Sequence, residues 1–485
     1  SDLKIESLIK VICLSNGAKD NCSNWRIFLP YDRFENGINY ELVLKADFNF
    51  DYENFPSYVN QSEYSYPNYN LAIFGENIFY VSEKLSITPG FRFENIKTSL
   101  DGYYRRINLD AAGNTIYNEI FNENDTFIEC VDLKEAGADI QEYEGLLSPG
   151  FVNAHCHLEL SHLKNVIPAH TGLQEFVKQI VALRKVEEHI IADAIEKAED
   201  EMFQNGIVAV GDICNTLDTL DQKIKHRIAY YSFVELYDLD PTRAHDKIIA
   251  GLAIQNTFQE NCIRASLVPH APYSVSYNLW KLLTEHFESH TITMHNQETK
   301  DENDFFQTKT GSFLGMYERT KVSLDFFEAT GLSSVQSILP YFKNAHRSIL
   351  VHNSFTSVED IQAVQKEMPN SFWCICANAN QYIEQTMPPI ELLRSQKVNI
   401  VMGTDSYASN WSLNMLDEIR TIQNHLPQIP LEELLGWATI NGAKALQMDK
   451  GLGSFEKGKK PGIVLIEGLS KENKIIESTS SRRII

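Results

Sequence analysis

Residues 151–160 read FVNAHCHLEL, a short apolar run that ends on two histidines flanking a cysteine. The preceding Ser148-Pro149-Gly150 is a turn signal. Side chains alternate between the two faces of a strand, so a strand here would place His155 and His157 on one face and Cys156 on the other. Two imidazoles on one face can clamp a metal ion, or they can be ordinary polar residues at the rim of a sheet. The pair alone does not decide between these explanations.

Similar apolar runs recur along the chain after Glu144, and each is followed by a segment with helical periodicity. Residues 173–204, for example, carry apolar residues at helical spacing with charges between them. The eight runs are 146–157, 206–215, 227–237, 264–272, 291–295, 348–352, 371–377 and 398–404. Eight strand-helix units predict an α/β fold, a (β/α)₈ barrel of the TIM type.

In such a barrel the chemistry gathers at the C-terminal ends of the strands, so metal-binding residues should lie where the runs end. The residues found at run ends are His155, His157, His270, His295, His352 and Asp405. Each has an ordinary explanation when taken alone: His270 would be a loop residue, and Asp405 would cap a helix. Such residues at so many run ends of one barrel are much harder to explain in that way. The sequence therefore predicts a site at this end of the barrel.

Composition narrows the classes of partner. The 485-residue chain is 43% hydrophobic, with a formal net charge of −22 and a pI near 5.1. Nucleic acids and anionic membranes attract clustered positive charge, so neither is an expected partner, whereas small neutral or cationic substrates remain open. The eight cysteines have no disulfide-framework spacing, and no apolar stretch reaches eighteen residues. With no basic-then-apolar signal segment, a cytoplasmic location is expected.

The front of the chain differs from the rest, since none of the 14 histidines precedes His155. Residues 71–97 predict two strands joined at Ser82-Glu83-Lys84, and Asp101-Gly102 and Gly113-Asn114 are further turn signals. Residues 66–126 resemble barrel strands of a TonB-dependent outer-membrane receptor, although so few strands cannot close a barrel. We expect residues 1–126 to be a β-rich segment: an appended domain, a chance likeness or, as we favour, a join between unrelated coding sequences.

From residue 127 to 466 the chain resembles the amidohydrolase superfamily. The motifs that carry this resemblance are His-x-His in PGFVNAHCHLELSHL, then PHAPY, HNQE, VHN and GTDSYASN, in that order. They are most similar to the branch of triazine hydrolases, guanine- and adenosine-type deaminases and aminodeoxyfutalosine deaminases. The resemblance implies a barrel over residues 149–445 and a small β-sandwich built from residues 127–148 and 446–485.

The resemblance also implies a mononuclear metal site, whose ligands would be His155, His157, His295 and Asp405. Three imidazoles and one carboxylate suit a borderline divalent ion, with Zn²⁺ expected first and Fe²⁺ or Mn²⁺ as alternatives. Such an ion lowers the pKa of a bound water and so generates hydroxide near neutral pH.

Catalytic roles follow from the same resemblance. Asp405 would take the proton of the metal-bound water, Glu298 would carry protons to the ring nitrogen and the leaving group, and His352 would hydrogen-bond the nucleophile or leaving group. His270 would contact the substrate. Glu298 could instead be a solvated residue in the first turn of a helix. Glu159 and His162, in the loop after the first strand, are weaker candidates for shaping the site.

The implied reaction is hydrolytic deamination of an amino-substituted heterocycle or nucleoside. The specific substrate that the resemblance suggests is aminodeoxyfutalosine. A chlorohydrolase or a cyclic-amide hydrolase would use the same metal ligands, and ammonia release across a panel of nucleosides would separate these enzymes. A non-catalytic outer-membrane barrel fragment or binding module is the alternative of another class, and a catalytically dead scaffold is a third. The N-terminal strands of the sandwich are not recognisable, and the unpaired sheet edge invites association, such as a homodimer.

Overall fold

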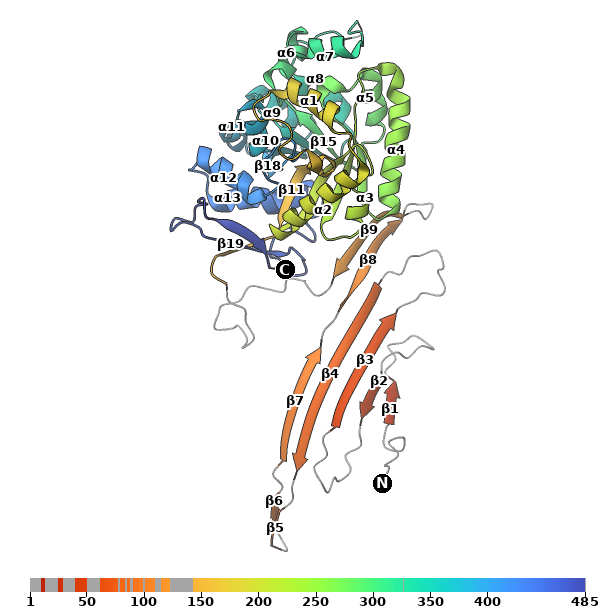
Figure 1. Ribbon diagram of the computed structural model, residues 1–485, viewed down its shortest axis with the longest axis vertical. Helices are drawn as coiled ribbons and strands as arrows, with labels where there is room; N and C mark the ends of the chain where they lie inside the picture. Colours follow the sequence, from red (N-terminus) through yellow and green to blue (C-terminus); the bar gives the residue numbers. More distant parts are fainter. Residues whose placement is uncertain are drawn as a thin grey trace. The chain divides into compact units, whose positions relative to one another are not determined.

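The computed structural model describes residues 143–325 and 327–484, together with the backbone of the strands that lie within residues 10–122 (Figure 1). The chain divides into one unit of residues 1–107 and 119–124, and a second of residues 108–118 and 125–485. The second unit carries every predicted site residue.

Antiparallel strands make up the described part of the first 122 residues, as the sequence predicts. They are β1 Lys10–Cys13, β2 Trp25–Phe28, β3 Tyr40–Asn49, β4 Ser62–Glu76, β5 Phe79–Ser82, β6 Leu85–Ile87, β7 Gly90–Thr98, β8 Asp101–Leu109 and β9 Thr115–Asn122. The predicted join at residues 82–84 is confirmed, because Ser82 pairs with Leu85 in the β5–β6 hairpin, but the prediction of two strands over residues 71–97 is wrong, since four strands, β4 to β7, lie in or overlap this range. The predicted turn at Asp101-Gly102 is wrong, since both residues pair with β4 as part of β8. Gly113-Asn114 lies outside the described residues.

Eight parallel strands form the centre of the second unit, one for each apolar run of the sequence. They are β11 Phe151–Cys156, β12 Ile207–Cys214, β13 Ala229–Leu236, β14 Arg264–Pro269, β15 Thr291–Asn296, β16 Arg347–His352, β17 Ser371–Ile375 and β18 Asn399–Met402. They pair in chain order as two four-stranded halves, β11 to β14 and β15 to β18. The strands are buried almost throughout, which explains why the runs are continuously apolar instead of alternating.

Backbone hydrogen bonds join the two halves at both seams. Between β14 and β15, the N–H of His295 donates to the carbonyl of His270 at 2.8 Å. Between β11 and β18, the N–H groups of Thr404 and Asp405 both donate to the carbonyl of His155, at 3.1 and 3.0 Å. The predicted (β/α)₈ architecture is thus confirmed, and both seams are linked at the C-terminal ends of the strands.

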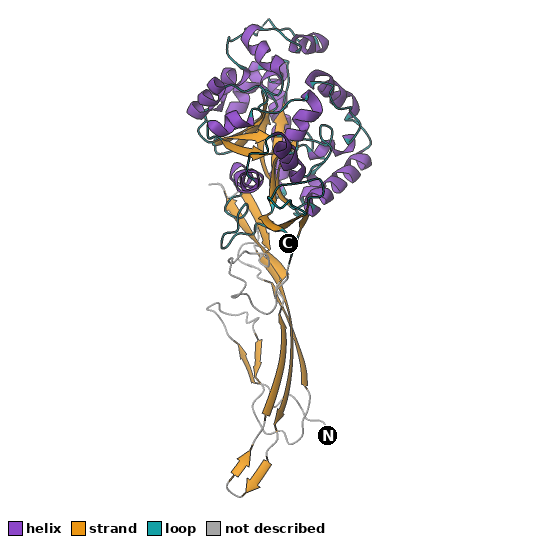
Figure 2. Ribbon diagram, turned by 90° about the vertical axis from the view of Figure 1, so that its left-hand side faces the viewer, coloured by secondary structure: helices purple, strands orange, loops and turns teal. Residues whose placement is uncertain are grey.

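Helices surround these strands (Figure 2). They are α1 Leu173–Leu183, α2 Glu188–Gln204, α3 Leu220–Lys223, α4 Ala244–Glu260, α5 Tyr277–Thr284, α6 Lys300–Thr308, α7 Phe313–Thr320, α8 Ser334–Ile338, α9 Val358–Glu367, α10 Ala377–Glu384, α11 Ile390–Ser395, α12 Met415–His425, α13 Leu431–Gly436 and α14 Gly442–Ala445, with 3₁₀ turns at Leu158–Leu163, Pro241–Arg243, Pro272–Ser274 and Leu339–Phe342 and a π-helical turn at Trp437–Asn441. Residues 173–204 form two helices and not one: α1 ends at Leu183, and the side chain of the next residue, Arg184, bonds Glu159 and Asn215. Among the described residues, no helix combines the length and the apolarity needed to cross a membrane.

The first apolar run contains two strands, a detail that the sequence did not predict. Leu146–Pro149 forms β10, which pairs antiparallel with β19 Ile463–Glu467, and β20 Ser480–Arg483 completes a three-stranded sheet. β19 and β20 both lie within residues 446–485, where the C-terminal part of the small sandwich is predicted. Of the predicted N-terminal part, residues 127–148, the first sixteen lie outside the described residues and the last three belong to β10, so the domain boundaries stay predictions.

Gly150 separates β10 from β11 at a point too crowded for a side chain. Its N–H donates to the carbonyl of Pro461 at 2.9 Å. A Cβ at this position would lie 2.2 Å from Cγ1 of Val208 and 2.6 Å from the Pro461 carbonyl oxygen. The chain therefore passes so close to the barrel at residue 150 that only glycine, which has no Cβ, fits there.

Gly150→Ala is expected to destabilise the fold by about 1–3 kcal/mol, as overpacking of a filled site does. Gly436→Ala is the matched control, because no atom lies within 4 Å of a Cβ built there. Denaturant unfolding followed by far-UV circular dichroism measures both variants. An unchanged midpoint for Gly150→Ala would contradict the close approach.

Candidate metal centre

Four predicted ligands from three separate strand ends meet at the C-terminal end of the barrel. His155 lies near the end of β11, and His157 follows that strand directly. His295 lies in β15, and Asp405 follows β18. The structure thus brings together residues that are 250 positions apart, counted from His155 to Asp405 (405 − 155).

The distances between these side chains are those of one cluster. Asp405 Oδ1 lies 3.4 Å from Nε2 of His155 and 3.3 Å from Nε2 of His157. Nε2 of His157 and Nε2 of His295 face one another at 3.2 Å. All four residues are at least nine-tenths buried.

The backbone turns sharply where it presents two of the site residues. Asp405 has a φ of 59° and His352 a φ of 74°, both in the left-handed region that non-glycine residues seldom occupy. Such conformations cost about 1–3 kcal/mol and persist only where surrounding structure enforces them. At Asp405 the enforcing contact is the hydrogen bond of its N–H to the His155 carbonyl.

The carboxylate of Asp405 is held in its ionised form. Burial acts to raise its pKa, but the nearby imidazoles of His155, His157 and His352 lower the pKa well below its usual range. Oδ2 also accepts a hydrogen bond of 2.5 Å from Ser409 Oγ. Oδ1 therefore remains available, on the side of the histidines.

Two of the imidazoles, those of His157 and His295, are favoured in the neutral form, which is the form that donates to a metal ion. Burial lowers the pKa of His157 and lowers that of His295 well below its usual range. Nδ1 of His295 donates to the carbonyl of His270 at 2.9 Å, so the lone pair of the neutral ring is on Nε2. That nitrogen points to the cluster.

These residues fit a divalent cation. Both ring nitrogens of His155 are buried without a hydrogen bond, and an unpaired buried polar atom costs about 1–3 kcal/mol. A cation among the three imidazoles and the carboxylate would satisfy His155 and separate the two facing Nε2 atoms. The donor set of nitrogen and oxygen suits Zn²⁺.

Glu298 and His352 lie beside this cluster and face one another. Glu298 Oε1 is 3.7 Å from Nε2 of His352. Burial raises the pKa of Glu298 well above its usual range, and the charges of Asp405 and Glu384 add to the effect. His352 Nδ1 donates to Asn380 Oδ1 at 2.7 Å, while its Nε2 is buried without a hydrogen bond. One ring nitrogen of His352 also lies within 4.8 Å of the donor atoms of His155, His295 and Asp405.

His270 lies next to the cluster, where its predicted contact with the substrate stays a prediction. Its ring centroid is 4.7 Å from that of His295, and its Nδ1 donates to Ser274 Oγ at 2.7 Å. Glu159 is a structural residue, because its carboxylate accepts hydrogen bonds from Arg184, from two backbone N–H groups and from a hydroxyl. His162 is not part of the cluster of possible metal-binding groups among the described residues.

The sequence did not predict three residues of the site. Asn380 orients His352, Ser409 bonds Asp405, and Glu235 of β13 lies 3.5 Å from His295 Nδ1. Glu235 could have been found from the sequence, because it is the one charged residue in the third apolar run, residues 227–237, apart from Arg227 at the start of the run. Ser409 lies within the GTDSYASN motif, which did not assign it a role, and Asn380 left no signal, because asparagine is ordinary in loops and at helix starts.

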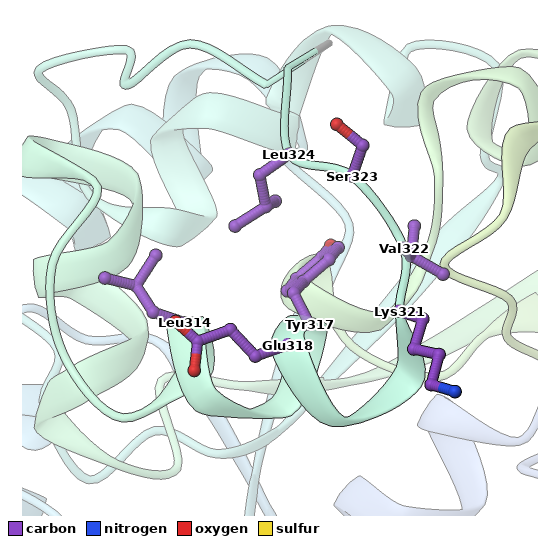
Figure 3. A pocket seen from close by; sticks show the side chains of 7 residues that line it. All are labelled: Leu314, Tyr317, Glu318, Lys321, Val322, Ser323 and Leu324. Carbon is purple, nitrogen blue, oxygen red and sulfur yellow. The ribbon is translucent and has the colours of Figure 1, made fainter.

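A cavity of about 400 Å³ lies away from this chemistry, on α7 and the segment that follows it (Figure 3). It is lined by Leu314, Tyr317, Glu318, Lys321, Val322, Ser323 and Leu324. None of the predicted site residues lines it, and it contains no histidine, so the metal cluster is the better candidate for a catalytic site.

Comparison with known proteins agrees with the amidohydrolase resemblance that the sequence motifs indicate. The model of the Amidohydrolase family matches residues 146–485. An adenosine deaminase of Helicobacter pylori is 25% identical over 381 residues, which cover 74% of this chain and 90% of that protein. Nothing in these comparisons supports the likeness of residues 66–126 to a receptor barrel, which stays a prediction.

Two solved structures share the fold. Helicobacter pylori aminofutalosine deaminase in complex with methylthio-coformycin has a TM-score of 0.61 and 24% identity, covering 78% of this chain and 97% of that one. Atrazine chlorohydrolase from Arthrobacter aurescens TC1, complexed with zinc, has a TM-score of 0.55 and 16% identity, covering 69% of this chain and 80% of that one.

His157 is a proposed metal ligand, whereas His352 lies beside the ligand cluster. Replacing each in turn by alanine tests whether the metal ion depends on the first and not on the second. His157→Ala is expected to weaken zinc binding by at least about 10-fold, the least that loss of even an outer-shell partner costs. His352→Ala is expected to retain zinc, as is His425→Ala, which removes an exposed histidine of α12. Metal analysis after dialysis against a zinc buffer measures all three, and retention of zinc by His157→Ala would contradict the ligand assignment.

Proposed function

Because the chain belongs to the amidohydrolase family, we propose that it is a metal-dependent hydrolase that deaminates a purine-like heterocycle or nucleoside. The observation that carries this proposal is the convergence of three imidazoles, one ionised carboxylate and one carboxyl of raised pKa at a single strand-end cluster. The match to an adenosine deaminase over most of both chains supports the substrate class.

One divalent ion, Zn²⁺ first, would be held by His155, His157, His295 and Asp405. When bound, such an ion supplies Lewis acidity that lowers the pKa of a water ligand toward neutrality. The fold likeness to a zinc-containing hydrolase supports the choice of zinc.

Glu298 would move the proton. Its burial and the charge of Asp405 favour the protonated carboxyl, so Oε1 can carry a proton that an ordinary exposed glutamate would have lost. The proton would pass first to a ring nitrogen of the substrate and then to the departing amine. General acid-base groups of this kind contribute about 10²–10⁴-fold in rate.

His352 would orient the reacting groups. The amide nitrogen of Asn380 donates to Ser354 Oγ at 2.8 Å, so its Oδ1 faces His352 and accepts from Nδ1–H. The neutral ring then has an acceptor at Nε2, which faces Glu298. This acceptor can hold a hydrogen of the attacking water or of the leaving amine.

The overall reaction balances as one C–N bond broken and one C–O bond formed. A ring C–NH₂ group and one water give a ring carbonyl and ammonia, with the protons moving through Glu298 and Asp405. No oxidant or reductant is needed. The expected partner is therefore a small heterocyclic substrate.

A chlorohydrolase is the second candidate, favoured by the fold shared with an atrazine chlorohydrolase. It would use the same ligand cluster and release chloride instead of ammonia. Assays for both products on aminopurine nucleosides and chlorotriazines separate the two activities.

A cytoplasmic location is proposed as well. All five described cysteines are free thiols, which supports a reducing compartment.

Glu298→Gln is expected to lower kcat by about 10²–10⁴-fold, because the amide cannot carry the proton. Bound zinc should stay at the wild-type level, since Glu298 is not among the proposed ligands. Glu433→Gln, which removes a partner of Arg394 on the outer helices, is the control and should leave kcat unchanged. Ammonia release and metal content are measured together. A wild-type kcat for Glu298→Gln would refute the proton-transfer role.

A further inference from the structure

Lys223 and Asp212 form a fully buried ion pair, outside the set of residues that the proposed mechanism uses. Nζ of Lys223, at the end of α3, lies 2.6 Å from Oδ2 of Asp212 in β12, and both side chains are 0% exposed. The ammonium also donates to Ser232 Oγ at 2.8 Å and to Cys214 Sγ at 3.1 Å, so each of its three hydrogens has a partner. Replacing a buried ion pair by apolar side chains is often neutral or stabilising, so fold stability alone does not explain this pair.

Asp212 holds the chain on both sides of the proposed metal ligand His157. Its backbone pairs with Cys156, the last residue of β11. Its Oδ1 accepts a hydrogen bond of 2.8 Å from the N–H of Leu158, where the next 3₁₀ turn begins. His157 lies between these two contacts and belongs to neither element, so Asp212 brackets it.

Glu159 adds a bond in the opposite direction. Its Oε2 accepts from the N–H groups of Asn215 and Thr216, which follow β12, at 2.9 and 3.1 Å. A carboxylate of β12 therefore holds the chain that follows β11, and a carboxylate beyond β11 holds the chain that follows β12. These reciprocal bonds leave the backbone at His157 little freedom.

Such restraint matters at a metal ligand. Zinc–nitrogen bonds are about 2.0–2.1 Å long, and a metal site tolerates only small departures from this length. Nε2 of His157 lies 3.3 Å from Asp405 Oδ1 and 3.2 Å from Nε2 of His295. A shift of the backbone at residue 157 would change both separations.

We propose that Asp212 is a positioning residue for His157, and that Lys223 neutralises its buried charge. The hydrogen bond to Leu158 fixes where the imidazole points and so sets the affinity of the cluster for a divalent ion. Removing the acceptor at residue 212 then weakens metal binding, whereas removing only the two charges does not. The inference rests on the proposed metal-dependent function and adds a residue to it.

Two double variants separate the acceptor from the ion pair. Asp212→Asn/Lys223→Met removes both charges and keeps an oxygen that can accept from the N–H of Leu158, whereas Asp212→Leu/Lys223→Met removes the charges and the acceptor. The zinc dissociation constant of the full chain, measured by competition with a chelator, should rise by at least about 10-fold in the leucine variant, as on loss of an outer-shell partner. It should stay near the wild-type value in the asparagine variant. The visible absorption spectrum of the cobalt-loaded chain should likewise change only in the leucine variant.

Gly150→Ala is the control for lost stability alone, because it crowds the chain before β11 and leaves the contacts of Asp212 in place. It should unfold at a lower denaturant concentration and keep the wild-type zinc affinity. If Asp212→Leu/Lys223→Met does not fold, Asp212→Ala/Lys223→Met lacks the same acceptor and replaces it in the comparison.

The outcomes separate the inference from the function on which it rests. Equal zinc affinity of the variants with and without the acceptor overturns the positioning role and leaves the metal centre standing. Failure of both variants without the acceptor to fold assigns the bond to the fold and also overturns the positioning role. A wild-type chain that folds but binds no zinc contradicts the proposed function, and the inference falls with it.

Discussion

The hydrogen bonds from Thr404 and Asp405 to the carbonyl of His155 are the constraint on which the site depends. They join the first and the last strand of the barrel, and they do so at the residues whose side chains form the metal cluster. The opposite seam repeats the arrangement, since the N–H of His295 bonds the carbonyl of His270. Three of the four proposed ligands, His155, His295 and Asp405, therefore share the backbone bonds that hold the halves together with His270, the proposed substrate contact.

The neighbouring side chains give the two buried carboxyl groups opposite properties. Asp405 faces imidazoles, which hold its pKa well below the usual range, whereas Glu298 faces other acids and a dry environment, which raise its pKa well above it. Two acids whose surroundings push their pKa values apart are suited to different tasks. One is an ionised ligand, and the other is a proton carrier. Asp405 and Glu298 are both carboxylic acids, so the charges around them, and not the residue types, give them different roles.

The sequence predicted the strands and the cluster because both follow from local patterns: a buried parallel strand is continuously apolar, and the site residues stand where such runs end. Features that depend on packing could not be predicted in this way. Gly150 separates the two strands of the first run where the Pro461 backbone and Val208 approach it, and α1 ends next to Arg184, whose side chain bonds Glu159 and Asn215. Asn380 belongs to the site only because the fold places α10 beside the end of β16, and its type and spacing carry no motif. Glu235 stands out as a charge within an apolar run, but only the fold shows that it lies beside His295.

Anomalous diffraction at the zinc edge, on crystals of the zinc-loaded chain, tests the central claim most directly. A single strong peak should lie about 2.0–2.2 Å from the imidazole nitrogens of His155, His157 and His295 and from a carboxylate oxygen of Asp405. A peak coordinated by other residues, or no peak in a protein that folds and is saturated with zinc, would contradict the metal centre and the hydrolytic chemistry assigned to it.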